Sequence, residues 1–208
     1  MVNNISMDKK NFDYTASDDD RSGQNFVGGW ACKQSKTVYE NPWIRLRHEV
    51  VERPNGTEGI YGLVQFKSRA LGVVAIDTDN NLVLVKQSRY ALNESALELP
   101  EGGGPMDEEP VHAAQRELEE ETGLLADSWE KILTIHTSNS VCDEIAYVYL
   151  ATELREGQQN LEDTEDIEVL RMPVVDAVNM ARSGEITDSM TVAALFRIAL
   201  DYPQYLTQ

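Results

Sequence analysis

The chain is short of cysteine, of long apolar runs and of basic side chains, and each shortage excludes a class of protein. Its 208 residues include two cysteines, Cys32 and Cys142. They have neither metal-ligand spacing nor the density of a secreted disulfide scaffold, so we expect two free thiols. The longest apolar runs, such as residues 82–85, fall far short of the ~20 residues that a membrane span requires, and the polar N-terminal stretch contains no signal segment. We therefore expect a cytoplasmic protein without a membrane partner.

Basic side chains are half as numerous as acidic ones. The sequence contains 18 Lys and Arg against 36 Asp and Glu, a formal net charge of −18. Binding of DNA or RNA requires a basic face that neutralises phosphates, so this balance excludes nucleic acid as a partner. A surface this acidic approaches an anionic ligand only where metal cations intervene. Hydrophobic residues make up 41% of the chain, which is ordinary for a globular protein with a sizeable core.

Composition divides the chain into three parts. The N-terminal stretch is polar, contains the acidic triplet Asp18-Asp19-Asp20 and ends at a pair of glycines, a composition typical of disorder. From Trp30 the pattern becomes strand-like. We expect a disordered acidic tail, an N-terminal β region that serves dimerisation, and a main domain, at residues 1–28, 29–68 and 69–208 respectively.

Apolar patterns predict the secondary structure. Alternation around a Pro-Asn-Gly turn predicts an antiparallel hairpin of Ile44–Val51 and Gly59–Phe66. Further strands are expected at Leu71–Ile76, Leu82–Gln87, Lys131–His136 and Ile145–Leu150, the last two paired. Helical spacing predicts helices at Glu109–Thr122, Pro173–Arg182 and Met190–Leu200, and Gly123 is the expected C-cap of the first. This order predicts an α/β (α+β) fold with sheet between helices.

Acidic residues are concentrated around the first predicted helix. Nine of them lie between Glu101 and Asp127, against one basic residue, Arg116. Such a run is often a solvated helix face. Here, however, Glu117, Glu120 and Glu121 follow an i, i+3, i+4 spacing, which stacks like charges on one side of a helix unless a cation lies among them. Hard divalent ions such as Mg²⁺ or Mn²⁺ prefer these carboxylate oxygens.

The neighbours of these glutamates also fit a metal site. Arg116 is placed to act as a local counter-charge that orients one of the carboxylates. Gly102, Gly103 and Gly104 are expected to form a permissive loop before the helix, so that main chain can approach a metal ion or a phosphate closely.

The segment resembles the signature of the Nudix hydrolases, a glycine, five residues, a glutamate, seven residues, and then Arg-Glu-apolar-any-Glu-Glu-any-Gly-apolar. Every defined position is met, by Gly102, Glu108, Arg116, Glu117, Leu118, Glu120, Glu121, Gly123 and Leu124. The resemblance implies an α/β/α sandwich with a mixed central sheet. It also implies a loop-helix-loop metal site at which water attacks a nucleoside diphosphate linked to a further group and splits a phosphoanhydride.

The resemblance assigns expected roles to the residues of this signature. Glu117 and Glu121 are the principal expected metal ligands, Glu120 is a further ligand, and the main-chain carbonyl of Glu101 completes the shell. With Arg116 these glutamates form the expected catalytic group, and Mg²⁺ or Mn²⁺ is the expected cofactor, because an acidic site reaches a charged diphosphate through a divalent ion. Glu108, near the helix start, is expected to be structural.

Flanking segments resemble the ADP-ribose and ADP-sugar pyrophosphatase branch of the family. The likeness lies in residues 38–43, 86–90, 98–100 and 183–188 and, with the signature, extends from Trp30 to Leu200. It implies that Arg89 contacts substrate phosphate and that Glu98 lies at the active site, with Gly102 and Gly103 close to the substrate. The alternatives are that Arg89 forms a surface ion pair and that Glu98 is a strand-end acid.

Two further expectations follow from the same branch. The general base is expected on an acidic loop after the signature, at Glu162 or Glu165, where the alternative is a solvated acidic loop. The protein is expected to be a homodimer whose N-terminal strands build part of the partner's nucleotide pocket. Trp43 or Tyr39 is then a candidate for stacking on the base, and the alternative is that both pack in the core.

One departure leaves the substrate open. ADP-ribose pyrophosphatases of this kind carry prolines about fifteen residues after the signature, but the corresponding loop here, residues 136–144, contains none. ADP-ribose is the first expectation, cleaved to AMP and ribose 5-phosphate, and ADP-glucose, GDP-mannose or another nucleoside diphosphate sugar remains an alternative. A Nudix-fold sensor that binds such a nucleotide without cleaving it is a second alternative. A plain acidic cation-binding module is a third, although the spaced pattern of a calcium loop is absent.

Overall fold

The computed structural model describes residues 21–161 and 166–207, in two compact units, one ending at Phe66 and one beginning at Lys67. The helices and strands are η2 (Val27–Gly29), β1 (Ala31–Glu40), β2 (Ile44–Glu52), β3 (Glu58–Phe66), β4 (Ser68–Ala75), β5 (Asn81–Arg89), β6 (Glu94–Glu98), β7 (Glu101–Pro105), α1 (Pro110–Thr122), β8 (Leu124–His136), β9 (Ile145–Glu156), β10 (Glu168–Pro173), α2 (Val174–Ser183), α3 (Ser189–Asp201) and η3 (Pro203–Leu206).

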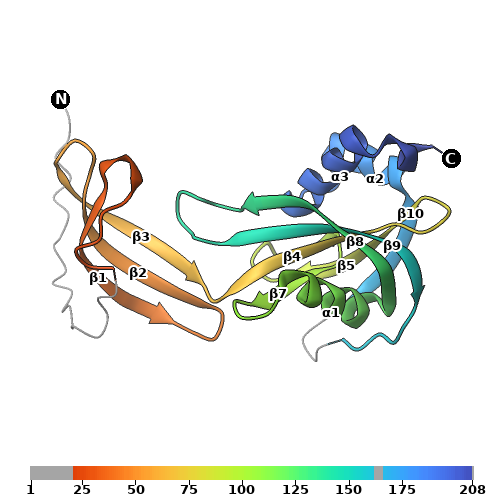
Figure 1. Ribbon diagram of the computed structural model, residues 1–208, viewed down its shortest axis with the longest axis horizontal. Helices are drawn as coiled ribbons and strands as arrows, with labels where there is room; N and C mark the ends of the chain where they lie inside the picture. Colours follow the sequence, from red (N-terminus) through yellow and green to blue (C-terminus); the bar gives the residue numbers. More distant parts are fainter. Residues whose placement is uncertain (1–20, 162–165, 208) are drawn as a thin grey trace. The chain divides into compact units, whose positions relative to one another are not determined.

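The first unit is a three-stranded antiparallel sheet in the order β1-β2-β3 (Figure 1). The predicted hairpin is confirmed, since β2 pairs with β3 in continuous register from Ile44 opposite Phe66 to Glu52 opposite Glu58. Strand β1 was not among the expected elements, because its polar sequence hides the alternation. The predicted tail reaches into the described residues at 21–28, where Asn25 bridges to Ala31.

The second unit contains two sheets. One has the order β7-β4-β9-β8, and β4 and β9 are parallel while the other pairs are antiparallel. The other sheet, β10-β5-β6, is antiparallel. The mixed central sheet predicted from the sequence is therefore confirmed, as is the expected pairing of Lys131–His136 with Ile145–Leu150.

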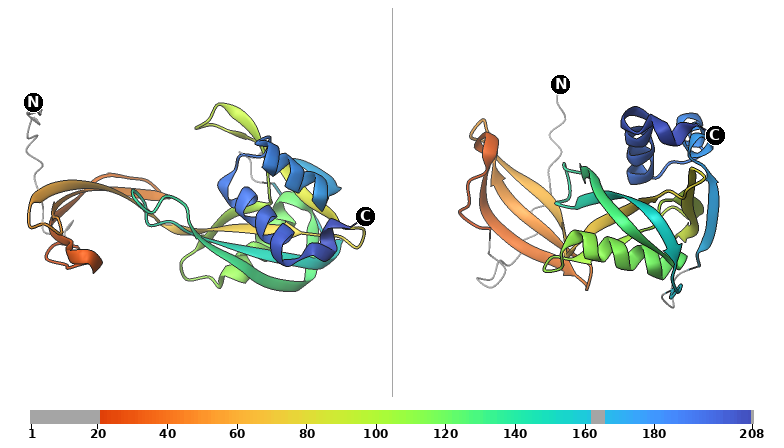
Figure 2. Two further views of the ribbon diagram at one scale, coloured as in Figure 1. Left: turned by 90° about the horizontal axis from the view of Figure 1, so that it is seen from above. Right: turned by 45° about the vertical axis from the view of Figure 1, so that its right-hand side comes forward.

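Helices cover both faces of this mixed sheet (Figure 2). Side chains of β4 alternate between two cores, as the period of a strand requires. Leu71 and Val73 pack with Leu118 of α1 in one core. Val74 packs with Leu195 of α3 in the other. The predicted α/β/α sandwich is thus confirmed, with β4 packed against α1 on one face and against α3 on the other.

The ends of α1 follow the signals in the sequence. Pro110 occupies the first turn, where its missing N–H is tolerated, and Gly123 ends the helix with a left-handed φ of 69°. Its amide donates a hydrogen bond to the carbonyl of Glu119 at 2.8 Å. The helix begins one residue later than predicted and ends where predicted.

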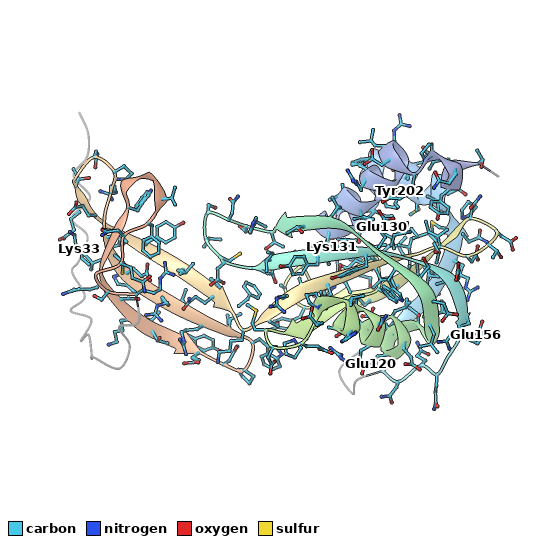
Figure 3. The ribbon with its side chains drawn as sticks, in the orientation of Figure 1. Lys33, Glu120, Glu130, Lys131, Glu156 and Tyr202 are labelled. Carbon is cyan, nitrogen blue, oxygen red and sulfur yellow. The ribbon has the colours of Figure 1, made fainter. Side chains whose placement is uncertain are left out.

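The C-terminal segment is hydrogen-bonded to the mixed sheet. The hydroxyl of Tyr202 donates a hydrogen bond to Oε1 of Glu130 on β8 at 2.8 Å (Figure 3). Tyr202 also stacks on Tyr205 of η3, with ring centroids 6.5 Å apart. Across residues 21–161 and 166–207, no helix has the length and apolar character to cross a membrane.

Candidate functional site

Helix α1 presents the three signature glutamates at different depths. Glu117 and Glu121, four residues apart, are buried, with 8% and 2% exposure. Glu120 projects further outward, with a side chain that is 30% exposed (Figure 3). Carboxylates of this kind are rarely buried without a partner, so the inward pair is the part of the helix that needs a counter-charge.

The glycines before the helix form a strand rather than the predicted loop. Residues 101–105 are β7, which pairs antiparallel with β4 from Gly102 opposite Leu71 to Pro105 opposite Ser68. Glycine has a low strand propensity, so the sequence conceals this strand. The expected close approach does hold, because a Cβ on Gly102 would collide with the Glu117 carboxylate.

The end of α1 is joined to the start of β7 and to the segment after β9. The main-chain amide of Glu101 donates a hydrogen bond to Oε2 of Glu121 at 2.9 Å. On the other side, Nε2 of Gln159 donates to the main-chain carbonyl of Glu121 at 2.6 Å. The amide of Asn160 donates to the carbonyl of Glu120 at 3.0 Å. The bonds from Gln159 and Asn160 satisfy carbonyls that a helix end leaves without partners, and all three bonds hold the turn that carries Glu121.

Arg116 pairs with more than one signature glutamate. Its Nη1 lies 2.8 Å from Oε1 of Glu117 and 2.8 Å from Oε2 of Glu120. Its Nη2 donates to the carbonyl of Gly103 at 3.1 Å and lies 3.9 Å from Oε2 of Glu108. Burial alone would lower the pKa of this guanidinium, but the negative charge of Glu117 and the bonds to Glu120 outweigh it and raise the pKa. Arg116 therefore stays charged and orients the acids around it.

A second arginine, which the sequence did not single out, holds the connection between β7 and α1. Arg69 on β4 donates hydrogen bonds to the main-chain carbonyls of Met106 at 2.8 Å, Glu108 at 3.0 Å and Pro105 at 3.4 Å. No local motif points to this role, because Arg69 lies more than thirty residues earlier in the chain.

Arg89 at the end of β5 is held by two acids. Its Nε donates to both oxygens of Glu98 at 3.0 Å, and its Nη2 donates to Oε2 of Glu98 at 2.6 Å. Nη2 also donates to Oε1 of Glu101 at 2.6 Å. Desolvation by itself lowers the pKa of Arg89, but the hydrogen bond to Glu98 and the nearby acids raise it overall. The ion pair joins a half-exposed side chain to a buried one, since the Arg89 side chain is 37% exposed and that of Glu98 only 3%.

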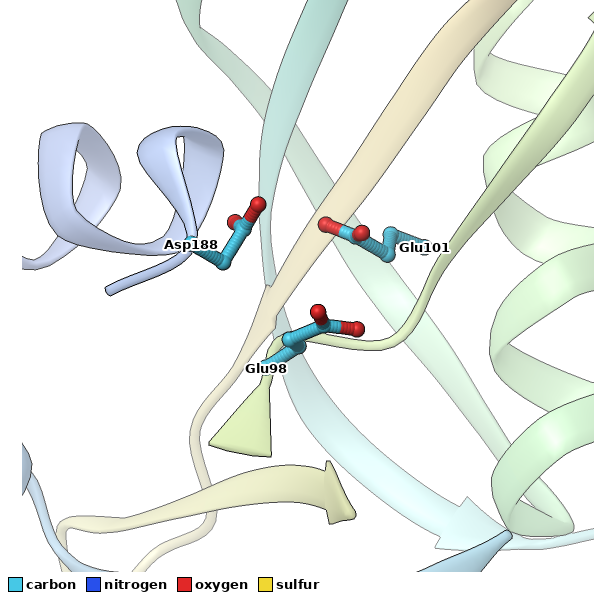
Figure 4. A group of neighbouring side chains, drawn as sticks. All are labelled: Glu98, Glu101 and Asp188. Atoms are coloured by element: carbon cyan, nitrogen blue, oxygen red, sulfur yellow. The ribbon is translucent and has the colours of Figure 1, made fainter. Parts of the chain in front are cut away.

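Three carboxylates from three elements meet beside Arg89 (Figure 4). They belong to Glu98 of β6, Glu101 of β7 and Asp188, the N-cap residue of α3. Burial first, and then the charges of Asp188 and Glu98, hold the pKa of Glu101 well above its usual value. From the sequence, Glu101 was expected to act through its main-chain carbonyl, and Asp188 was not among the expected site residues. The aspartate before an apolar helix was the available signal.

The remaining predicted site residues lie in the first unit or outside the residues that the structure describes. Trp43 and Tyr39 belong to the first unit and are 69% and 55% exposed, so the alternative that they pack in the core of this chain is wrong. Glu162 and Glu165 lie outside the described residues. Glu101, Gly102, Gly103, Arg116 and the three helix glutamates are brought together around α1 and β7.

The donor set is suited to a hard divalent cation. Carboxylates of Glu117, Glu120 and Glu121 and the main-chain oxygen near β7 are all oxygen ligands, the chemistry that Mg²⁺ and Mn²⁺ prefer. Gly102 leaves the space beside Glu117 that a side chain would fill. The residues therefore fit the expected metal ion.

Comparison with known families matches nearly the whole described chain. Residues 67–192 match the model of the NUDIX domain, and residues 30–64 match that of the nucleoside diphosphate sugar hydrolase N-terminal domain. The two matches fall on either side of the division between the two units.

Individual proteins agree with these matches. An ADP-ribose pyrophosphatase of Bacillus subtilis (strain 168) is 36% identical over 160 residues, 76% of this chain and 86% of that protein. A GDP-mannose pyrophosphatase of Salmonella arizonae is 33% identical over 162 residues, 73% of this chain and 77% of that protein. Among solved structures, an ADP compounds hydrolase superposes with a TM-score of 0.77 at 20% identity, covering 89% of this chain and 99% of the other, which supports the fold.

Proposed function

The chain belongs to the Nudix hydrolase family, and on that premise we propose that it hydrolyses the pyrophosphate bond of ADP-ribose, releasing AMP and ribose 5-phosphate. Two of its relatives are named as pyrophosphatases, one of ADP-ribose and one of GDP-mannose. The observation that carries the proposal is the buried pair Glu117 and Glu121 on α1, aligned one turn apart beside β7.

A divalent metal ion, Mg²⁺ or Mn²⁺, is part of this proposal. Glu117, Glu121, Glu120 and the main-chain carbonyl of Glu101 are the groups that would hold it. When bound, such an ion neutralises negative charge on the diphosphate and on the oxygen that leaves. An acidic protein with a net charge of −18 has particular need of that charge.

The side chains around the metal ligands have separate tasks. Arg116 keeps Glu117 and Glu120 in place through its two 2.8 Å contacts. Arg89 is the proposed contact to substrate phosphate. Its bonds to Glu98 and Glu101 use Nε and Nη2, and a guanidinium has five N–H donors, so further donors remain for a phosphate oxygen.

The water that attacks the phosphate needs a base to accept its proton. We propose Glu162 or Glu165 for this task, on the acidic segment that follows Asn160. Support comes from the point at which this segment starts. Gln159 and Asn160 are bonded to the C-terminal turn of α1, so the described chain just before the acidic segment lies beside the proposed metal ligands.

The choice between ADP-ribose and other sugars rests on the nucleotide and sugar contacts. The relative from Bacillus subtilis favours ADP-ribose, and the relative from Salmonella arizonae keeps GDP-mannose as the second candidate. Residues 137–141 form a turn between β8 and β9 that contains no proline. If this turn contacts the sugar, its different backbone is the feature that changes the preference.

A homodimer completes the proposal, and the first unit supports it. Val38, Tyr39, Trp43 and Ile60, all from its three strands and their turns, are 40%, 55%, 69% and 55% exposed. A sheet with this many exposed large apolar side chains is typical of an interaction surface. We propose that it pairs with a second copy, with Trp43 or Tyr39 available to stack on a base.

A cytoplasmic location, which the two free cysteines favour, is also proposed.

A panel of substrates tests the proposed function. The full chain is incubated with ADP-ribose, ADP-glucose and GDP-mannose in turn, with Mg²⁺ and with Mn²⁺, and the products are separated by anion-exchange chromatography. We expect AMP and ribose 5-phosphate to form faster than the products of the other two. Faster cleavage of GDP-mannose would replace the substrate, and tight binding with no cleavage of any of the three would favour the non-hydrolytic sensor.

A further inference from the structure

The carboxylates of Glu98, Glu101 and Asp188 form a cluster that the helix metal site does not use. One oxygen from each residue lies within 4.8 Å of one oxygen from each of the others. The three come from β6, from β7 and from the start of α3, so the fold itself brings them together across long stretches of sequence (Figure 4).

The positive charge at this cluster is smaller than the negative charge. The guanidinium of Arg89 pairs with Glu98 and with Glu101, each at 2.6 Å. One guanidinium neutralises one carboxylate, which leaves two of the three acids without an equal counter-charge. Glu121 adds a further negative charge nearby, because its Oε2 accepts the hydrogen bond from the Glu101 amide.

A buried oxygen of Glu101 points to a cationic ligand. Its Oε2 is inaccessible to solvent and, within the described ranges, has no hydrogen-bond partner, while Oε1 pairs with Arg89. The whole side chain is only 11% exposed, and Figure 4 shows the carboxylate directed toward Asp188. Proteins rarely leave a buried polar atom unpaired, because no interaction then compensates for the hydration that the atom loses. A cation between Glu101 and Asp188 would compensate for the lost hydration of Oε2.

The geometry suits a divalent ion. Opposite oxygen ligands lie about 4.2 Å apart around Mg²⁺ and about 4.8 Å apart around Ca²⁺, twice the usual metal–oxygen distances. The three oxygens all lie within 4.8 Å of one another, so no two are farther apart than opposite ligands of a Ca²⁺ ion. Two of the carboxylates are also held in place. Oδ2 of Asp188 accepts the amide hydrogen of Thr191 at 2.7 Å, and Oε2 of Glu98 accepts a hydrogen bond from Gln87 at 3.1 Å.

We propose that Glu98, Glu101 and Asp188 bind a second divalent cation, separate from the ion held by the glutamates of α1. Asp188 is partly exposed, which leaves room for water to complete the shell. The binding itself does not depend on the proposed function. Its consequence does, since a cation there adds positive charge beside Arg89, the proposed phosphate contact.

Manganese binding by the full chain tests this assignment. Mn²⁺ is titrated without substrate into the wild type and into the variants Glu101→Gln, Asp188→Asn and Glu121→Gln, and free Mn²⁺ is followed by its electron paramagnetic resonance signal. Asp188→Asn is the sharpest variant, because asparagine also caps a helix and the residue lies away from α1. Glu101→Gln preserves the main-chain carbonyl. Circular dichroism checks that each variant is folded, and either of the first two variants alone decides the question.

We expect Asp188→Asn and Glu101→Gln each to bind one Mn²⁺ fewer than the wild type, or to bind it at least tenfold more weakly. Glu121→Gln should retain that ion and lose a different one. An unchanged number and affinity of Mn²⁺ ions in folded Asp188→Asn would overturn the proposal, and so would the loss of every Mn²⁺ ion in Glu121→Gln. Failure of the substrate panel would leave this result untouched, so the two proposals fail separately.

Discussion

The main-chain amide of Glu101 donates a hydrogen bond to Oε2 of Glu121 at 2.9 Å, which joins the first residue of β7 to the last turn of α1. Glu101 thereby contacts both sets of carboxylates, the glutamates of α1 and the cluster beside Arg89. Its amide holds a proposed metal ligand, while its side chain reaches Arg89. Because these roles are divided between main chain and side chain, substitutions at Glu101 can distinguish the two proposed cation sites.

Arg116 should be needed for metal affinity rather than for folding. Arg116→Ala removes the contacts to Glu117 and Glu120, and loss of such a supporting group costs about 10- to 100-fold in metal affinity or activity. Arg116→Lys keeps the charge but loses the fork that reaches both acids, so it should recover only part of the loss. Turnover at increasing Mg²⁺ concentrations measures the effect. Equal half-maximal Mg²⁺ concentrations in wild type and Arg116→Ala would contradict this role.

Gln159 should support the same helix from its other side. Gln159→Ala removes the 2.6 Å bond to the carbonyl of Glu121 and leaves that helix-end group without its partner. We expect Mn²⁺ to bind about tenfold more weakly, the lower end of the range for supporting groups. The neighbouring exposed residue supplies the matched control, Gln158→Ala, which should bind Mn²⁺ like the wild type. Equal Mn²⁺ affinities of the two variants would show that Gln159 has no such role.

The glycines of β7 should respond differently to the same added methyl group. In Gly104→Ala the new Cβ would lie 2.8 Å from Leu71 and 2.9 Å from Ala113, within packed core, so the free energy of unfolding should fall by about 1–3 kcal/mol. In Gly103→Ala the nearest atom is Oγ of Ser68 at 3.4 Å, an ordinary contact, and stability should change little. Urea unfolding of the two variants provides the comparison, and equal midpoints would contradict the tight packing at Gly104.

Gly102→Ala should affect the reaction instead of stability. Its new Cβ meets the end of the flexible Glu117 side chain, which can move aside at small cost to the fold. The moved carboxylate no longer lies where a metal ligand is needed. We expect a melting temperature near that of the wild type together with a loss of turnover of at least tenfold, the lower bound for disturbance of a metal site. Undiminished turnover would mean that the position of Glu117 is not critical.

Removal of divalent metal should lower stability as well as activity. A ligand that binds only the folded chain stabilises it in proportion to the logarithm of its concentration. We expect the melting temperature to rise as Mg²⁺ is added to chelator-treated protein, and to rise less in Glu121→Gln. A melting temperature independent of Mg²⁺ up to millimolar concentration would indicate that the buried carboxylates of Glu117 and Glu121 hold no ion.

The sequence was sufficient to predict features that depend on neighbours in the chain. Helix α1 was predicted to within one residue, because Pro110, the spacing of its apolar side chains and Gly123 are all local signals. The stacking of Glu117 with Glu121 follows from the helix period alone. The mixed sheet was predicted from the family resemblance, and the register of its strands was not.

Features that depend on tertiary contacts were missed or misread. The glycines of β7 resembled a loop, because their strand is defined by pairing with β4 and not by their own propensity. Asp188 lies close to Glu101 although 87 residues separate them in the sequence, a contact set by the packing of α3. Arg69 and Gln159 act on main-chain carbonyls, which carry no sequence signal at all.

The most direct test of the proposed function compares turnover of ADP-ribose by the wild type and by Glu121→Gln, with Mg²⁺ present and AMP measured. Glu121 is 2% exposed and glutamine has nearly its shape, so the variant should fold while losing a metal ligand. We expect rapid formation of AMP by the wild type and a loss of orders of magnitude in the folded variant. Near-normal turnover by Glu121→Gln would contradict the assignment of the reaction to the carboxylates of α1.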